Sequence, residues 1–193
     1  MLEKTKTNIE GVVIFKPQVF HDHRGFFIET FSNKKYFSAG LTETFVQDKF
    51  SHSSRNTIRG LHYQKTKPQG KLVRVAQGIV FDVAVDIRVG SPTFGNYFST
   101  ILDDKAFNQL YMPPGIAHGF CVLSEFAVFE YKCTEYYYPE DEAGVLFNDP
   151  DIAIDWPVDD ARLSEKDLSY PKLSDIAKKN LPDYHLLIKH QLK

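Results

Sequence analysis

Hydrophobic side chains recur at every second position in much of this sequence, and this period constrains the fold more than any other feature. The clearest case is Ile79 to Arg88, where one face of an extended strand would carry Ile79, Phe81, Val83, Val85 and Ile87. The other face would carry Asp82, Asp86 and Arg88 beside small or apolar residues. One face is therefore expected to pack and the other to hold polar groups.

Nine further segments have strand character, and turns rich in Gly and Pro separate several of them. They are Gly11 to Phe15, Phe26 to Phe31, Phe45 to Ser51, Thr57 to Gln64, Leu72 to Ala76, Tyr97 to Leu102, Gln109 to Met112, Gly119 to Leu123 and Ala127 to Tyr136. Helical patterns are confined to Asn33 to Ala39 and to segments after Leu163, where a capped turn is expected to begin at Ser164. The sequence predicts an all-β domain of the sandwich or barrel type with a few short peripheral helices.

The 193 residues suffice for one main domain, which we assign to residues 1–174. Residues 175–193 are more polar and lose the strand period, so they are expected to form a C-terminal helical appendix or a partly ordered tail. A formal charge of −2 gives no global attraction to nucleic acid or to an anionic membrane. Any phosphate group would have to be bound by local Arg and Lys side chains.

The first seven residues lack an apolar core of signal-peptide length, and no apolar run approaches the roughly 20 residues of a spanning helix. Cys121 and Cys133 lie in strand-like runs without metal-ligand spacing. We therefore expect buried free thiols and a cytoplasmic location.

A possible base and a fixed cation lie within the length of one β-hairpin. His62 belongs to the segment Arg59 to Gln64, and Lys71 follows it by nine residues. A carbon acid beside a ketone is far weaker than an imidazolium, so a histidine deprotonates it only if a positive donor stabilises the enolate. The pair therefore suits proton abstraction next to a carbonyl group.

Nine motifs, in order, resemble those of the dTDP-4-dehydrorhamnose 3,5-epimerase family. They are Arg24 to Glu29, Arg59 to Gln64, Gln69 to Arg74, Asp82 to Arg88, Ser91 to Gly95, Ala117 to Phe120, Tyr131-Lys132, Asn148-Asp149 and Leu163 to Asp167. The resemblance runs from about Gly11 to Pro171. It implies a cupin-type jelly roll that acts as a homodimer, without metal or organic cofactor, on a nucleotide-diphospho-4-keto-6-deoxy sugar.

Carried over to this sequence, the resemblance implies four catalytic residues. His62 would remove the protons at C3 and C5, Asp167 would orient it, Lys71 would stabilise the enolate, and Tyr131 would return a proton from the opposite ring face. The substrate-binding residues implied are Phe26, Gln47, Lys49, Arg59, His118, Phe120 and Tyr137, with Arg24 and Glu29 reaching the neighbouring subunit's site. The chain departs from the family at Lys49, where Asn is usual, and this extra ammonium could change which nucleotide or sugar is accepted.

Other interpretations of these residues remain open. Taken singly, His62, Lys71 and Tyr131 fit structural roles in a β-rich domain, and only the assembled motifs favour chemistry. A metal site at His21 and His23 has suitable spacing but no third ligand in the usual order. The activity could also be a single-site 3- or 5-epimerase, or act on a GDP- or CDP-linked sugar. An alternative of another class is a catalytically silent cupin that binds a nucleotide sugar.

Overall fold

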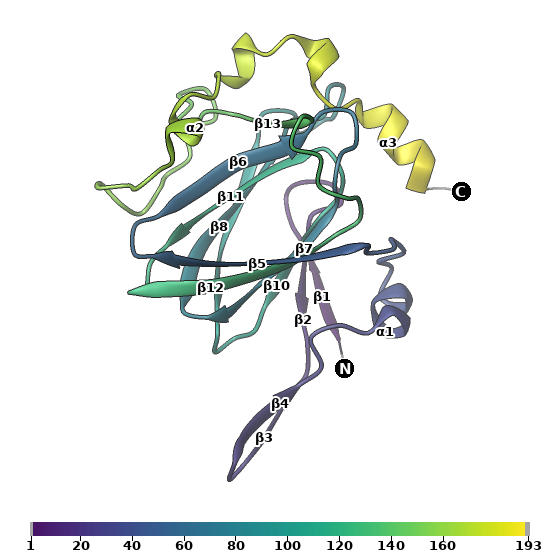
Figure 1. Cartoon of the computed structure of the whole chain (residues 1–193). Helices are drawn as coiled ribbons and strands as arrows, with labels where there is room; N and C mark the ends of the chain where they lie inside the picture. The colour runs from purple at the N-terminus through teal and green to yellow at the C-terminus, as the bar shows by residue number, and fades with distance from the viewer. Residues whose placement is uncertain (1, 192–193) are drawn as a thin grey trace.

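Thirteen strands and three short helices make up the secondary structure of residues 2–191, the part of the chain that the computed structural model describes (Figure 1). The strands are β1 (Glu3–Lys6), β2 (Val13–Lys16), β3 (Val19–Asp22), β4 (Gly25–Ile28), β5 (Gln47–Ser54), β6 (Ile58–Gln64), β7 (Lys71–Gln77), β8 (Ile79–Asp86), β9 (Tyr97–Asp103), β10 (Gln109–Met112), β11 (Ile116–Val122), β12 (Phe126–Cys133) and β13 (Glu142–Gly144). The helices are α1 (Asn33–Ser38), α2 (Glu165–Leu168) and α3 (Tyr184–Gln191), with 3₁₀ turns at Leu173–Asp175 and Lys178–Asn180.

Two antiparallel sheets face each other and form the body of the molecule (Figure 1). The six-stranded sheet has the order β1-β2-β10-β7-β12-β5, and the five-stranded sheet has the order β13-β6-β11-β8-β9. Between β9 and β12 each successive strand belongs to the other sheet, so the chain winds around a shared interior. The predicted all-β jelly roll is confirmed.

All ten strands predicted from the sequence are present, and so are the helix near Asn33 and the turn that begins at Ser164. Three strands were not predicted, namely β1, β3 and β13. All four residues of β1 are exposed, β3 is largely exposed, and β13 has only three residues. None of the three carries alternating apolar side chains, so they had no signal to detect.

Both faces of β8 are buried, although the sequence predicted one packed face and one polar face. Val80 and Ala84 point into the core between the sheets, while Val83 and Val85 belong to a second core. The second core is completed by apolar residues of the C-terminal third, Val145, Ile152, Leu173 and Leu181. The chain after β13 therefore covers the outer face of the five-stranded sheet.

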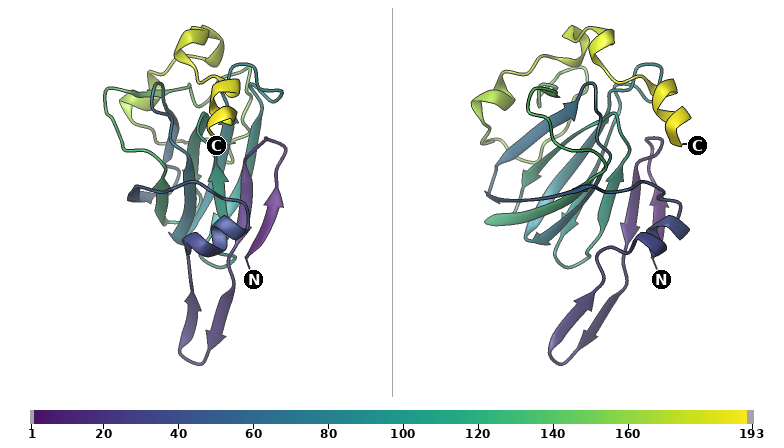
Figure 2. Two further views of the ribbon diagram at one scale, coloured as in Figure 1. Left: turned by 90° about the vertical axis from the view of Figure 1, so that its right-hand side faces the viewer. Right: turned by 45° about the vertical axis from the view of Figure 1, so that its right-hand side comes forward.

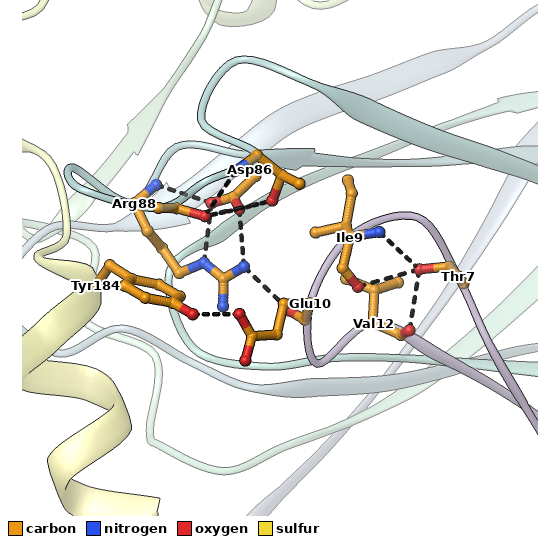
Figure 3. Close-up of polar contacts among 9 residues, drawn as sticks. Thr7, Ile9, Glu10, Val12, Asp86, Arg88 and Tyr184 are labelled. Carbon is orange, nitrogen blue, oxygen red and sulfur yellow. Dashed lines mark hydrogen bonds and ion pairs between the residues drawn. The ribbon is translucent and has the colours of Figure 1, made fainter.

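A buried ion pair joins the N-terminal turn to the C-terminal helix (Figure 3). The Arg88 guanidinium donates to both carboxylate oxygens of Asp86 at 2.8 Å and to the main-chain oxygen of Glu10 at 3.0 Å. It also lies 5.2 Å from the ring centroid of Tyr184, whose hydroxyl donates to the Glu10 carboxylate. Residues 192 and 193 of the predicted C-terminal appendix lie outside the described residues.

A two-stranded ribbon of β3 and β4 projects from the body and pairs with neither large sheet (Figure 2). Its aromatic side chains are solvent-exposed, with Phe26 at 54% and Phe27 at 69%.

The two cysteines are buried and unpaired on β11 and β12, as predicted. Within residues 2–191, no helix has the length and apolar character needed to cross a membrane.

Strand β6 bulges where it pairs with β11. His62 lies opposite His118, whereas Arg59 lies opposite Phe120, so three steps along β6 match two along β11. At the bulge Gly60 has a φ of +135°, and a Cβ there would lie 2.4 Å from the Cα of Gly119. Only two glycines permit this approach of the two backbones.

We expect Gly60→Ala to destabilise the protein strongly, and Gly25→Ala provides a matched control. Gly25 has a nearly identical φ of +136° but no neighbouring atom within 4 Å of an added Cβ. The control should lose about 1–3 kcal/mol through backbone strain alone. Gly60→Ala should lose about 1–3 kcal/mol more through overpacking. Urea unfolding measures both, and equal losses would show that the contact with Gly119 is unimportant.

Candidate active site

A cavity of about 210 Å³ opens between the two sheets, at one end of the sandwich. Its lining comes from both sheets and from the segments that follow them, and consists of Lys49, His62, Tyr63, Gln64, Gln69, Lys71, Tyr131, Tyr137 and Glu142. Three of the four predicted catalytic residues, His62, Lys71 and Tyr131, thus share one cavity. The fourth, Asp167, lies directly behind His62.

The Asp167 carboxylate binds the His62 ring, although the two residues are far apart in sequence. His62 Nε2 lies 2.5 Å from Asp167 Oδ1, and Asp167 is only 5% exposed. Asp167 is held in helix α2, whose first turn is capped because Ser164 Oγ accepts a hydrogen bond from the Asp167 main-chain N–H at 3.1 Å. With Nε2 bound to the carboxylate, Nδ1 is the ring nitrogen that can accept a proton.

Lys71 reaches the cavity from the sheet opposite His62. Strands β6 and β7 follow each other in the chain but belong to different sheets, so the two residues do not form a hairpin pair. The Lys71 ammonium donates to the main-chain oxygen of His62 at 3.4 Å. Burial lowers the pKa of Lys71 and the like charge of Lys49 adds to this, whereas Cys133, Glu142 and Asp82 oppose the effect in that order. A cation is therefore held against the backbone of the candidate base.

Tyr131 lies on β12, where its Cα is paired with Lys49 on one side and Val73 on the other. Burial raises the pKa of Tyr131 to about 12. The phenol therefore keeps its proton at neutral pH and is able to donate it.

Four other predicted site residues do not line this cavity: Gln47, Arg59, His118 and Phe120. The β6 bulge turns Arg59 to the same side as His62, and its Nε donates to Ser53 Oγ at 2.9 Å. His118 is buried and bonded to Asp82 at 3.0 Å.

Lys49 and Tyr137 form the rim of the cavity. The Lys49 ammonium lies 3.8 Å from the ring centroid of Tyr137, and burial lowers the pKa of Lys49. The Tyr137 hydroxyl donates to Glu142, which also accepts from Lys166 at 2.9 Å and Tyr170 at 3.4 Å. Glu142 was missed by sequence reasoning because a lone acid on a three-residue strand carries no pattern.

Arg24, Phe26 and Glu29 are not brought to this cavity within the chain. They lie on or just after the projecting ribbon, where the Arg24 side chain is 78% exposed and paired with Asp22, and Glu29 is paired with Lys35. His21 of the metal alternative lies on the same ribbon. Within the described part of the chain, no three His, Cys, Asp or Glu residues gather in a metal-binding cluster.

A larger cavity, of about 520 Å³, lies mainly on the outer face of the six-stranded sheet. It shares Lys49 and Tyr131 with the smaller one and is otherwise lined by Thr30, Asp48, Phe50, Leu72, Arg74, Gln109, Glu130 and Lys132. The side chains of Leu72 and Arg74 alternate with the inward Lys71 and Val73 on β7. The two cavities therefore adjoin at the Lys49–Tyr131 pair.

The family model for dTDP-4-dehydrorhamnose 3,5-epimerase matches residues 6–175. The chain belongs to this epimerase family. The family's enzyme from Methanothermobacter thermautotrophicus is 47% identical over 173 residues, which are 88% of this chain and 94% of that protein. The resemblance that nine sequence motifs indicated is therefore confirmed.

Solved structures of the family agree with the fold. The epimerase RmlC from Legionella pneumophila Philadelphia 1, in complex with dTDP-4-keto-L-rhamnose, is 48% identical. The two structures superpose with a TM-score of 0.93, and the match covers 95% of this chain and 99% of the other. ChmJ, a 3'-monoepimerase from Streptomyces bikiniensis in complex with dTDP-quinovose, is 31% identical with a TM-score of 0.91, covering 96% of each chain.

We expect Ser164→Ala to loosen the support of the His62–Asp167 pair. Loss of a helix N-cap typically costs about 1 kcal/mol, and here the lost bond is to the main chain of Asp167 itself. Ser169→Ala is a suitable control, because the Ser169 hydroxyl donates to the main-chain oxygen of Lys166 at the other end of α2, and this hydrogen bond is solvent-exposed. Urea unfolding together with catalytic rate should separate the two variants, and equal behaviour would contradict the role of the cap.

Proposed function

We propose that this chain epimerises a nucleotide-diphospho-4-keto-6-deoxyhexose at C3 and C5, converting dTDP-4-dehydro-6-deoxy-D-glucose to dTDP-4-dehydro-L-rhamnose. The observation that carries the proposal is the meeting of an Asp-bound histidine, a buried lysine and a protonated phenol in one cavity. Such a set provides a base, an enolate-stabilising cation and an acid. Membership of the epimerase family supports the same reaction.

In the proposed mechanism, Nδ1 of His62 removes the proton from a carbon next to the C4 ketone. The electron pair of the broken C–H bond moves into the ring and produces an enolate, whose oxygen is stabilised by the Lys71 ammonium. Tyr131 then donates its proton to the same carbon from the opposite face, which inverts the configuration. His62 returns its proton to solvent and Tyr131 regains one, so each inverted carbon carries a solvent hydrogen.

Asp167 has two functions in this scheme. Its bond to Nε2 keeps Nδ1 unprotonated before the reaction and stabilises the imidazolium afterwards. We assign the remaining inward residues to substrate binding: Gln47, Lys49, Arg59, His118, Phe120 and Tyr137. Arg59 would bind the diphosphate and Tyr137 would stack on the nucleotide base.

Incubation with dTDP-linked and GDP-linked 4-keto sugars in heavy water tests substrate and chemistry together. With the dTDP sugar we expect deuterium at both C3 and C5 by mass spectrometry and NMR, and none with His62→Asn. Label at one carbon would favour a single-site enzyme, the activity of the relative ChmJ. Deuterium incorporation only into the GDP-linked sugar would indicate a different nucleotide specificity, and Lys49 would be the first residue to examine for its cause. Saturable binding of a sugar nucleotide without deuterium incorporation would indicate a catalytically silent binding module.

Tyr131→Phe should separate exchange from inversion. Without the phenol, His62 still removes a proton and can return solvent deuterium to the same face, so exchange should persist. Formation of the epimer should fall by about 10²–10⁴-fold, the usual contribution of a general acid. Tyr136→Phe, an exposed residue that does not line either cavity, is the control. Equal loss of exchange and inversion in Tyr131→Phe would contradict its assignment as the acid.

We further propose a homodimer in which the β3–β4 ribbon of each subunit covers the site of the other. The ribbon exposes the rings of Phe20, Phe26 and Phe27, and apolar side chains of this size favour burial. A second copy would cover them and would receive Arg24 and Glu29 at its cavity. The adjoining cavity on the outer sheet face, beside the exposed Phe50, offers space for such a contact.

Subunit complementation tests this exchange. Arg24→Ala and His62→Asn should each be nearly inactive alone. In a mixed dimer one site would combine His62 of one subunit with Arg24 of the other, so random mixing should restore about a quarter of wild-type activity. No recovery, with mixed dimers verified by mass, would contradict the assignment of Arg24 to the neighbouring site.

We also propose that the reaction needs no metal or organic cofactor, because the three catalytic groups supply every proton transfer and the stabilising charge. We also propose a cytoplasmic location. We further propose that residues 1–174 form the domain and residues 175–193 a C-terminal appendix. The buried free thiols Cys121 and Cys133 fit a reducing compartment.

A further inference from the structure

Asp82 is a fully buried carboxylate on the inward face of β8. It is 0% exposed, and both its oxygens lie within hydrogen-bond distance of His118 Nε2, at 3.2 and 3.0 Å. His118 is itself 7% exposed and stacks on Phe129, with ring centroids 5.8 Å apart. Within residues 2–191, no Lys or Arg forms an ion pair with Asp82.

This pair lies beneath the catalytic groups. His118 is directly opposite His62 in the register of β11 and β6, and the main-chain oxygen of His62 accepts from the Lys71 ammonium. Asp82, His118, the His62 backbone and Lys71 therefore form one continuous cluster from the core to the cavity. Asp82 is its most deeply buried member.

The charges around Lys71 leave it in need of a negative partner. The groups that face it are Lys49 on β5, His62 on β6, Asp82 on β8, His118 on β11, Tyr131 and Cys133 on β12, and Glu142 on β13. Burial raises the pKa of Tyr131 and of Cys133 and lowers that of His118, so all three are neutral at pH 7. Lys49 carries the same charge as Lys71. The carboxylates of Glu142 and Asp82 are therefore the two groups of this set that can supply a negative charge.

Of these two carboxylates, Glu142 lies at the rim, where the Lys166 ammonium at 2.9 Å compensates its charge and Tyr137 and Tyr170 donate to it. Asp82 interacts with a neutral imidazole, so its negative charge is not cancelled by its own hydrogen-bond partner. A buried ammonium without a compensating charge would be strongly disfavoured.

We propose that Asp82 is a positioning residue that fixes the orientation of His118 and contributes, beside Glu142, a buried negative charge that helps to keep the Lys71 ammonium protonated for the reaction. The catalytic part rests on the proposed function of Lys71. The electrostatic part concerns the folded protein alone and is tested separately below.

The first test is the pH dependence of kcat for Asp82→Asn. Without the carboxylate, Lys71 should lose its proton at lower pH, so the basic limb of the profile should move down by about 1–3 units. The rate on the acid side of that limb should change much less than the rate above it. Asp86→Asn is the matched control, since Asp86 is equally buried four residues along β8 but binds Arg88 (Figure 3), Ser91 and Thr93. It should lower the Tm without moving the limb.

A double-mutant cycle in thermal stability provides the second test and requires no activity. Lys71→Met leaves Asp82 without its counter-charge, so Asp82→Asn should raise the Tm in that background while lowering it in the wild type. Equal Tm changes in both backgrounds would overturn the charge pairing. A folded Asp82→Asn enzyme with an unmoved basic limb would overturn the catalytic role. Absence of any epimerase activity would instead contradict the proposed function and leave the stability cycle decisive for Asp82.

Discussion

Close contact between the backbones of β6 and β11 sets the geometry on which the whole site depends. Gly60 and Gly119 lie so near each other that a side chain at either position would collide with the neighbouring strand. The bulge at this contact places Arg59 and His62, three residues apart, on the same side of the strand. In a regular strand an odd spacing would turn one of them outward. The absence of two Cβ atoms therefore allows Arg59 to lie on the same side as the candidate base.

The jelly roll interior holds charge in two clusters on one strand, and the two are arranged differently. Asp86 is neutralised by Arg88 and holds the end of β8 against the N-terminal turn and the C-terminal helix. Asp82 meets a histidine instead, beside the cavity. Because burying an ion costs several kcal/mol unless another charge or several hydrogen bonds compensate, each needs a dedicated partner. For Asp86 the partner is structural, whereas for Asp82 it lies in the proposed catalytic machinery.

Strand patterns in the sequence predicted ten of the thirteen strands of residues 2–191, because all of these except the exposed β4 bury at least part of one face. They could not assign the two faces of β8, since a strand that separates two cores shows the same alternation as one that faces solvent. The motifs predicted His62, Lys71 and Tyr131, which share one cavity. They did not include Glu142, and they gave no role to Asp82 although it begins one of the nine motifs, because a single acid carries no spacing by which its role can be read.

The sequence by itself determined the local features: the strand period, the cap at Ser164, and the motifs that place the chain in its family. Each depends on residues close together in the chain. The resemblance predicted that Asp167 orients His62, and the tertiary structure brings the two together across 105 residues. Only the tertiary structure decided that Lys71 faces His62 from the opposite sheet. It also decided that Asp82 lies beneath both. Such meetings depend on sheet order and strand register, which arise from packing the whole chain and are encoded in no single segment.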